Sequence, residues 1–269
     1  DLRDAIMLLE TFNRGYVKHA INRDVAKGLL SYALAARGST GDLKEVVSTT
    51  NEVIQNSGAR ITSANEVAAR LDVNGNLENP ESGFNNVATA SWLWGVDLTL
   101  DSKLDLASWW GQIDYFTYSY AYVGDGKIID DKLYGAIKPG DIRKKQFDED
   151  LWPTGKFFAP DRVAGGQRDI LTDYIFMRFD EMVLLNAEAN AKLGNDNAAK
   201  IALKSLLKER FANPAEYAYV DQLSGQNLLN EIYLQTRIEL WGEGKTYLAL
   251  KRNKQTIHRG NNHLFHKGA

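Results

Sequence analysis

Cysteine is absent from this chain of 269 residues, and its absence excludes several kinds of chemistry. Without a thiol the protein forms no disulfide, holds no metal through thiolates and has no cysteine nucleophile. The absence does not identify the cellular compartment. The chain also has no Gly-x-Ser-x-Gly, no Walker loop and no dinucleotide-binding fingerprint, so it carries none of the short motifs of the common hydrolases and nucleotide-binding enzymes.

A strong charge and long apolar runs are missing as well. The net charge of −3 and the pI near 5.9 do not fit a nucleic-acid binder, which is usually basic. No apolar run approaches the roughly 18 residues that a membrane span needs. The charged start at Asp1 leads straight into a helical pattern and does not resemble a signal peptide, so we expect this chain to be a piece of something longer.

Aromatic residues are concentrated in one stretch. Half of residues 109–122 are aromatic, against 10% of the whole chain. From Phe116 to Tyr122 they alternate with Thr117, Ser119 and Ala121, which is the period of a β-strand with one aromatic face. Tyrosine and tryptophan combine a flat apolar ring with one polar atom, so such residues either fill a core or line a site for an amphipathic ligand such as a sugar.

Helical hairpins flank this stretch on both sides. Within residues 1–58, an apolar stripe ends at Gly38, and Asp42 is expected to cap the next helix, residues 43–56. The short connection predicts two antiparallel helices, an αα-hairpin of tetratricopeptide type. Residues 173–269 return to helix, with a second hairpin that turns at Gly194. A third helical stretch, residues 227–253, is interrupted by glycines and is expected to form two helices.

Residues 59–172 form a long irregular, partly β insert. The segment 91–98 reads as a strand that places Trp92 and Trp94 on one face, and we assign both to the core. Loops of this length on a helical scaffold are where sites tend to lie. The predicted fold is therefore mainly α, with tetratricopeptide-like hairpins and an insert packed on the same composite domain.

Several segments resemble the SusD/RagB family. Residues 232–252 are similar to the family's C-terminal signature, an Arg-Ile/Glu-Glu-Leu run followed by Glu-Gly, an aromatic residue, a leucine and a basic pair. Residues 177–195 and 25–54 resemble its two hairpins. Two short matches lie between them, Asp141-Ile142-Arg143 and Gly155-Lys156-Phe157. Leu248-Ala249 departs from the family's more usual Phe/Leu-Asp.

The resemblance implies a SusD-like fold and a surface-exposed outer-membrane lipoprotein of a glycan-foraging bacterium. Such proteins bind oligosaccharide, cap a TonB-dependent, SusC-like transporter and are not enzymes. Family members are longer, with a signal, a lipidated cysteine and an N-terminal region, so this chain resembles the C-terminal part of one. The implied partners are an oligosaccharide and the transporter, with no nucleic acid, cofactor or metal.

The aromatic stretch supplies the candidate ligand-binding residues. Tandem tryptophans beside a glycine suit an exposed loop, so Trp109 and Trp110 are the first candidates for stacking on a sugar, followed by Tyr115 and Tyr118. The segment 116–122 is interpreted as a supporting strand in the core. Sugars also need polar groups that orient their hydroxyls. The nearby polar candidates are Gln112, Asp114, Asp125, Lys127 and Arg143.

Alternative functions remain open at this point. A helical-repeat scaffold can bind a peptide or protein partner on its helices. A glycoside hydrolase needs two carboxylates at a fixed separation, and the acidic clusters 130–131 and 148–150 are the only dense ones, although acidic runs near turns are usually solvated. A metal site at His258, His263 and His266 would lie in a polar tail, which we interpret as solvated.

Charged residues in the helical hairpins are interpreted as structural. Glu239 and Glu243 are four residues apart, and such a like-charge pair on a helix is unfavourable unless Arg237 or Lys245 neutralises it. Arg178 and Glu181 have ion-pair spacing. We therefore expect ion pairs between helices here and no catalytic residue.

Overall fold

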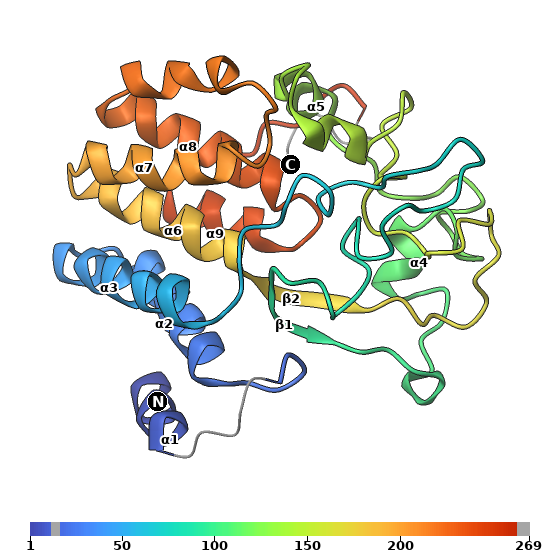
Figure 1. The fold of residues 1–269 in the computed structure, drawn as a ribbon, viewed down its shortest axis with the longest axis horizontal. Coiled ribbons are helices and arrows are strands. Elements are labelled where there is room, and N and C mark those ends of the chain that lie inside the picture. Colours follow the sequence, from blue (N-terminus) through green and yellow to red (C-terminus); the bar gives the residue numbers. More distant parts are fainter. Residues whose placement is uncertain (12–16, 263–269) are drawn as a thin grey trace. The chain divides into compact units, whose positions relative to one another are not determined.

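The computed structural model describes residues 1–11 and 17–262 (Figure 1). Its helices and strands are α1 (Leu2–Thr11), α2 (Arg23–Arg37), α3 (Thr40–Asn56), β1 (Trp92–Val96), α4 (Trp109–Ile113), α5 (Asp131–Ala136), β2 (Tyr174–Arg178), α6 (Phe179–Lys192), α7 (Asp196–Leu207), α8 (Gly225–Glu239) and α9 (Lys245–Arg252). The predicted mainly helical fold is confirmed. Within the described ranges, every helix is too short or too polar to cross a membrane.

The chain divides into two compact units. Within the described residues, the helical unit comprises 1–62, 90–94 and 176–257, and the loop unit comprises 63–89, 95–175 and 258–262. The predicted arrangement, hairpins 1–58 and 173–269 with an insert of 59–172 on one composite domain, stays a prediction.

The first hairpin has the caps that its sequence suggests, with one correction. Gly38 ends α2 in the left-handed region at φ 72°, which glycine adopts without strain. Asp42 was expected as the cap of the next helix, but α3 begins earlier, with Ser39 as N-cap. The Ser39 hydroxyl accepts the Asp42 N–H at 3.2 Å, and the Asp42 carboxylate accepts the Ser39 N–H at 3.1 Å. This reciprocal capping box fixes the helix start three residues before Asp42.

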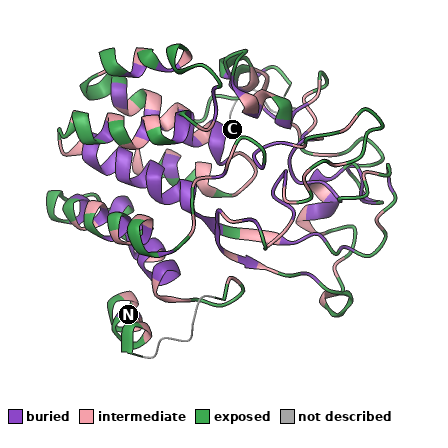
Figure 2. Ribbon diagram, viewed as in Figure 1, coloured by how far each residue is buried: buried purple, intermediate pink, exposed green. Residues whose placement is uncertain are grey.

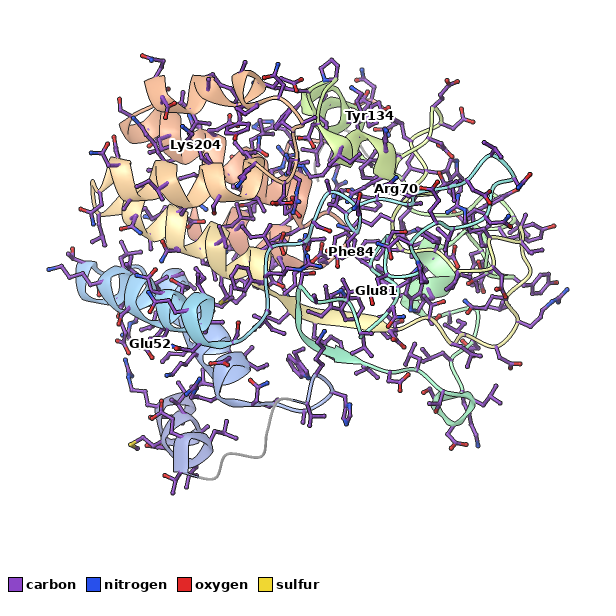
Figure 3. All side chains as sticks on the ribbon, viewed as in Figure 1. Glu52, Arg70, Glu81, Phe84, Tyr134 and Lys204 are labelled. Atoms are coloured by element: carbon purple, nitrogen blue, oxygen red, sulfur yellow. The ribbon has the colours of Figure 1, made fainter. Side chains whose placement is uncertain are left out.

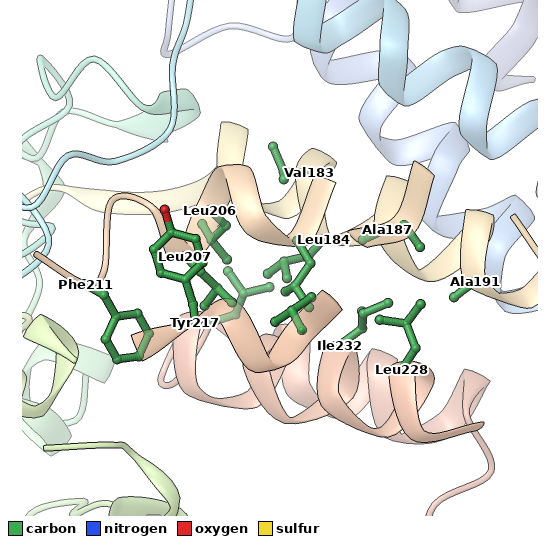
Figure 4. Packing of buried hydrophobic residues seen from close by; sticks show 14 of the residues in the cluster. Val183, Leu184, Ala187, Ala191, Leu206, Leu207, Phe211, Tyr217, Leu228 and Ile232 are labelled. Atoms are coloured by element: carbon green, nitrogen blue, oxygen red, sulfur yellow. The ribbon is translucent and has the colours of Figure 1, made fainter. Parts of the chain in front are cut away.

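Helix α6 is the centre of the helical unit. It contacts α2, α3, α7 and α8, and every residue from Phe179 to Ala191 is buried (Figure 2). One apolar face, which includes Met182, Leu185 and Ala189, packs with α2 and α3. A second face, which includes Val183, Leu184, Ala187 and Ala191, packs with α7 and α8 (Figure 4). A helix that is buried all round in this way holds two hairpins together.

A buried ion network lies where α6 begins, and we define it as Arg178, Asp180, Arg210, Glu239 and Glu243. Arg178 contacts Glu239 at 2.8 Å, Glu243 at 2.8 Å and Asp180 at 3.0 Å. Arg210 contacts Asp180 at 2.7 Å and Glu239 at 2.8 Å. Burial alone lowers the pKa of the Arg178 guanidinium, but the charges of Glu243, Asp180 and Glu239 raise it well above its usual value. Arg178 therefore stays charged.

The network confirms structural ion pairs but corrects their partners. Arg178, not Arg237 or Lys245, neutralises Glu239 and Glu243, while Arg237 lies over the ring of Tyr233. Glu181 lies at ion-pair spacing from Arg178, and its side chain contacts two other groups. Its carboxylate accepts the Arg178 backbone N–H at 2.9 Å and pairs with Lys245 at 2.9 Å. Spacing along one helix could not reveal these partners, because Arg178 ends β2 and Lys245 begins α9.

The strands correct the predicted secondary structure at two points. Residues 174–178 were expected to be helical but form β2, which pairs with β1 in a two-stranded sheet. The strand at Trp92 is confirmed, although it is shorter than predicted. Trp92 is fully buried, and Trp94 is half-buried with its ring 4.9 Å from that of Phe176. The core assignment is therefore confirmed for Trp92, while Trp94 packs against the core as a partly buried residue.

The third helical stretch forms two helices, as predicted. Gly242 and Gly244 lie between α8 and α9 with φ of 77° and 75°. These backbone angles favour glycine, so the break follows directly from the sequence.

Removal of Arg210 tests the buried ion network. Arg210→Met leaves buried carboxylates with one arginine instead of two, so we expect the free energy of unfolding to fall by about 3–5 kcal/mol. The control is Lys204→Met, because Lys204 (labelled on α7 in Figure 3) makes a solvent-exposed pair with Asp221. Its loss should cost less than about 1 kcal/mol. Urea denaturation measures both, and equal losses in the two variants would contradict the account.

Candidate functional site

The tandem tryptophans form part of the aromatic core of the loop unit. Ser108 caps α4 by accepting the Gly111 N–H at 3.2 Å, so the expected loop is a short helix (Figure 1). A Cβ at Gly111 would lie 2.1 Å from the Leu106 carbonyl oxygen. The glycine beside the tryptophans therefore serves close packing of α4 against backbone, not exposure of a loop.

The packing corrects the prediction that both tryptophans are exposed. Trp110 is fully buried, and Trp109 is half-buried with its ring edge-on to Phe157 at 4.8 Å. Both rings also lie near Tyr174, at 5.6 and 6.1 Å. Phe84, labelled in Figure 3, adds a further ring 6.2 Å from Phe157. Trp110 is therefore a core residue, and it is not carried into the proposed site.

Asp114 organises the turn that follows α4. Its buried carboxylate accepts the Phe116 N–H at 2.9 Å, the Thr117 hydroxyl at 2.6 Å and the Ala159 N–H at 3.0 Å. Burial raises the pKa of Asp114 to about 6, against these hydrogen bonds, which lower it. Asp114 was a predicted sugar contact, but the structure gives its carboxylate to the protein's own backbone.

Buried and exposed residues alternate along 117–122, as the sequence suggests, but the tyrosines are on the exposed face and not in the core. Tyr118, Tyr120 and Tyr122 are exposed, while the small residues between them are buried. The segment is a series of turns, not a strand, and its β-type contact is a single parallel bridge between Thr117 and Gln167. The expected core role of the tyrosine face is therefore wrong.

Hydrogen bonds of the small side chains explain this orientation. The Thr117 hydroxyl donates to Asp114 and accepts from the Gln167 side chain at 2.7 Å, and the Ser119 hydroxyl donates to the Thr117 carbonyl at 2.8 Å. Buried hydroxyl groups need such partners. Because these partners lie inside, the tyrosines on the other face point outward.

Three of the outward tyrosines form a contiguous surface, which we call the tyrosine platform: Tyr115, Tyr118 and Tyr122. Their rings are 39%, 43% and 37% exposed. The Tyr122 ring lies 5.8 Å from that of Tyr115 and 6.2 Å from that of Tyr118, with tilted planes. Tyr120 is also exposed, but in the described chain its ring has no contact with these three. The platform thus combines flat apolar faces with phenol hydroxyls.

The loop 159–168 supports the platform from a distant part of the sequence. A Cβ at Gly165 would lie 2.9 Å from the Tyr122 ring, so a glycine is needed where the ring packs. The Gly165 N–H donates to the Tyr115 carbonyl at 3.2 Å. The Arg168 guanidinium lies 3.9 Å from the centre of the Tyr118 ring. Neither Tyr122 nor Arg168 was a predicted site residue.

The other predicted polar contacts take different positions. Arg143 is fully buried and pairs with Asp141 at 2.5 Å, so it is a structural residue. Gln112 is half-buried, and its carbonyl accepts the Lys127 N–H at 2.9 Å. Lys127 and Asp125 are exposed. Of the predicted site residues, Tyr115 and Tyr118 are the ones that the structure brings together on the surface.

The acidic clusters serve as caps of backbone turns. Asp130 caps α5 by accepting the Leu133 N–H at 3.0 Å, and Asp148 accepts the N–H groups of Asp150 and Trp152. His258 is exposed, and the other two histidines of the predicted polar tail, His263 and His266, lie outside the described residues. In the part of the chain that the structure describes, no three histidine or acidic side chains are grouped as a metal site requires.

The chain combines a unit of helical hairpins with a loop-rich unit that has an exposed aromatic surface. These features define the class of protein. The chain belongs to the SusD family, whose model matches residues 111–267, more than half of the sequence. This match includes the C-terminal signature and the second hairpin, so the resemblance seen in the sequence is confirmed. A search of curated proteins found no match.

Solved structures share this fold. A SusD-like carbohydrate binding protein from Bacteroides vulgatus is similar with a TM-score of 0.70 and 27% identity, over 96% of this chain and 51% of that one. A SusD superfamily protein from Bacteroides thetaiotaomicron has a TM-score of 0.72 and 21% identity, over 98% and 56% of the two chains. NanU of Bacteroides fragilis has a TM-score of 0.52 and 18% identity, over 93% and 60%. The chain thus spans a little over half the length of these proteins.

The raised pKa of Asp114 predicts a pH dependence of stability. Because the folded-state value is about 6 and the ordinary value is 3.8, the folded protein holds a proton between these values that the unfolded chain has released. The free energy of unfolding should therefore fall by roughly 1–3 kcal/mol as the pH rises from about 4 to 6, from this group alone.

The measurement is urea denaturation at several pH values in wild type and Asp114→Asn. The variant lacks the titrating group, so its loss of stability over this range should be smaller by that amount. Other carboxyl groups titrate equally in both proteins and cancel in the comparison. Identical pH profiles would contradict the assignment.

Proposed function

We propose that this protein binds oligosaccharide without catalysis at the cell surface and delivers it to a TonB-dependent, SusC-like transporter of the outer membrane. In this proposal a lipid anchor outside the present sequence holds it on the extracellular face. Family membership supports the general role. The observation that carries the assignment to this chain is the exposed tyrosine platform, which combines ring faces with hydroxyl groups.

The chemistry of the platform suits a sugar. A pyranose presents an apolar face of C–H groups and a rim of hydroxyls, and it needs a flat surface together with a few placed polar groups. Tyr115 and Tyr122 present tilted rings 5.8 Å apart, which matches an oligosaccharide whose successive rings change orientation. The polar side chains beneath the platform, Thr117 and Ser119, already have hydrogen-bond partners inside the protein.

A second candidate function, binding of a peptide or protein partner on the helices, is favoured by one observation. A hollow of about 620 Å³ lies along α7, lined in part by Lys200, Ile201, Lys204 and Tyr217. Ile201 is 72% exposed there. Such a surface would suit an acidic, partly apolar segment, and it lies in the helical unit rather than on the platform.

Glycan-array binding tests the proposed function. Tyr115→Ala and Tyr122→Ala should each weaken binding of the best oligosaccharide by about tenfold, since a stacking aromatic contributes roughly 1–2 kcal/mol. The matched control is Tyr247→Ala, which removes a 60% exposed tyrosine of the helical unit and should leave binding unchanged. Thermal melts check folding.

Two outcomes would count against the proposal. Absence of binding to any oligosaccharide by the wild type would remove the sugar-binding role of this chain. Binding that survives both platform variants but is lost in Ile201→Asp would transfer the site to the hollow on α7.

Gly165 offers a second test that leaves the tyrosines in place. Gly165→Ala places a methyl group against the Tyr122 ring and should weaken oligosaccharide binding several-fold by displacing it. Gly124→Ala is the control, because Gly124 also has a positive φ but open space around its Cβ position. Isothermal titration calorimetry measures both. Equal effects in the two variants would show that backbone strain, and not the ring position, is responsible.

A further inference from the structure

Arg168 is held in a defined position beside the platform. The residue before it, Gln167, is fixed by two backbone hydrogen bonds, from the Tyr118 N–H to the Gln167 carbonyl at 2.9 Å and from the Gln167 N–H to the Phe116 carbonyl at 3.1 Å. Its side chain also donates to Thr117 at 2.7 Å and accepts from Thr172 at 3.0 Å. The backbone next to Arg168 is therefore held in place by the hydrogen bonds of Gln167.

The Arg168 guanidinium has no ion-pair partner among the residues that the structure describes. It is exposed, and its interaction is the stack on the Tyr118 ring at 3.9 Å. Other surface arginines differ, because Arg3 pairs with Glu45 at 2.9 Å and Arg70 pairs with Glu78 at 3.1 Å. Asp169 follows Arg168 directly but forms no salt bridge with it.

Stacking on Tyr118 leaves the binding groups of the guanidinium available. A cation–π contact uses the flat face of the guanidinium, whereas its N–H groups lie in the plane and point outward as a fork. That fork matches the two oxygens of a carboxylate. The stack also reduces the conformational freedom of the arginine before a ligand binds, which lowers the entropic cost of binding.

We infer that the tyrosine platform selects oligosaccharides that contain a uronic acid, with Arg168 as the carboxylate-binding residue. This inference rests on the proposed function. In this arrangement one pyranose ring stacks on Tyr115 or Tyr122, and the carboxylate at C5 of a ring in the same chain lies in the plane of the guanidinium. Tyr118 then acts as the support for Arg168 and presents its hydroxyl rather than its covered face.

The experiment compares acidic oligosaccharides with their own carboxyl-reduced forms, in which each uronate becomes the corresponding neutral sugar. A panel of galacturonate, glucuronate-containing and alginate hexasaccharides is titrated into the full chain by calorimetry. At least one acidic member should bind about tenfold more tightly than its reduced form, as a charge-assisted hydrogen-bonded pair would produce. The difference should shrink at high salt.

Variants identify the residue responsible. Arg168→Gln should abolish the preference, so that the variant binds the acidic form no more tightly than the reduced form. Arg168→Lys keeps the charge but lacks the fork, so it should retain only part of the preference. Arg70→Gln is the control, because it removes an exposed arginine of the same unit and should keep the full preference.

The outcomes separate this inference from the proposed function. Tight binding of neutral oligosaccharides with no gain from a carboxylate, or a preference that Arg168→Gln leaves intact, would overturn the role of Arg168 while the platform still binds sugar. If neither acidic nor neutral oligosaccharides bind, and a broader glycan array is also negative, both the proposed function and this inference are wrong.

Discussion

Two buried arginines, Arg178 and Arg210, and the carboxylates that surround them constrain how the elements of the helical unit meet. Charges taken out of water are tolerated only when their partners are in place. Thr62, the last residue of the helical unit before the chain enters the loop unit, joins this network, since the Arg210 guanidinium donates to its carbonyl at 2.6 Å. Arg178 lies two residues after the chain returns to the helical unit at Phe176. The network therefore fixes both ends of a segment of more than a hundred residues within one buried cluster.

The loop unit repeats this principle with hydrogen bonds. It has little regular secondary structure, so its backbone groups depend on side chains such as the buried Asp114 and the half-buried Gln167 for partners. Because the carboxylate of Asp114 and the amide of Gln167 draw Thr117 inward, the alternating tyrosines are turned toward solvent. The candidate binding surface is thus a consequence of the hydrogen bonds that the buried polar groups make inside the loop unit. Gly165 and Arg168 of one neighbouring loop pack against its rings.

Much of the fold could be predicted from the sequence. Apolar periodicity and the glycines at 38, 194, 242 and 244 mark the hairpins, because both act within a few residues along the chain. The alternation after Phe116 was visible too, but a period of two defines two faces without saying which is buried. The choice depends on Asp114, Gln167 and a loop some fifty residues away. Trp110 misled for a similar reason, since the rings that bury it, Phe157 and Tyr174, come from segments distant in the sequence.

Ring signals of tyrosine give the most direct test of the central claim that the tyrosine platform is the sugar-binding surface. Protein labelled with ¹³C in its tyrosine rings is titrated with the tightest-binding oligosaccharide from a glycan array and followed by NMR. The account predicts shifts for Tyr115, Tyr118 and Tyr122, with Tyr217 and the exposed Tyr247 of the helical unit unchanged. Shifts confined to tyrosines of the helical unit, with the platform signals unmoved while the sugar is bound, would contradict it.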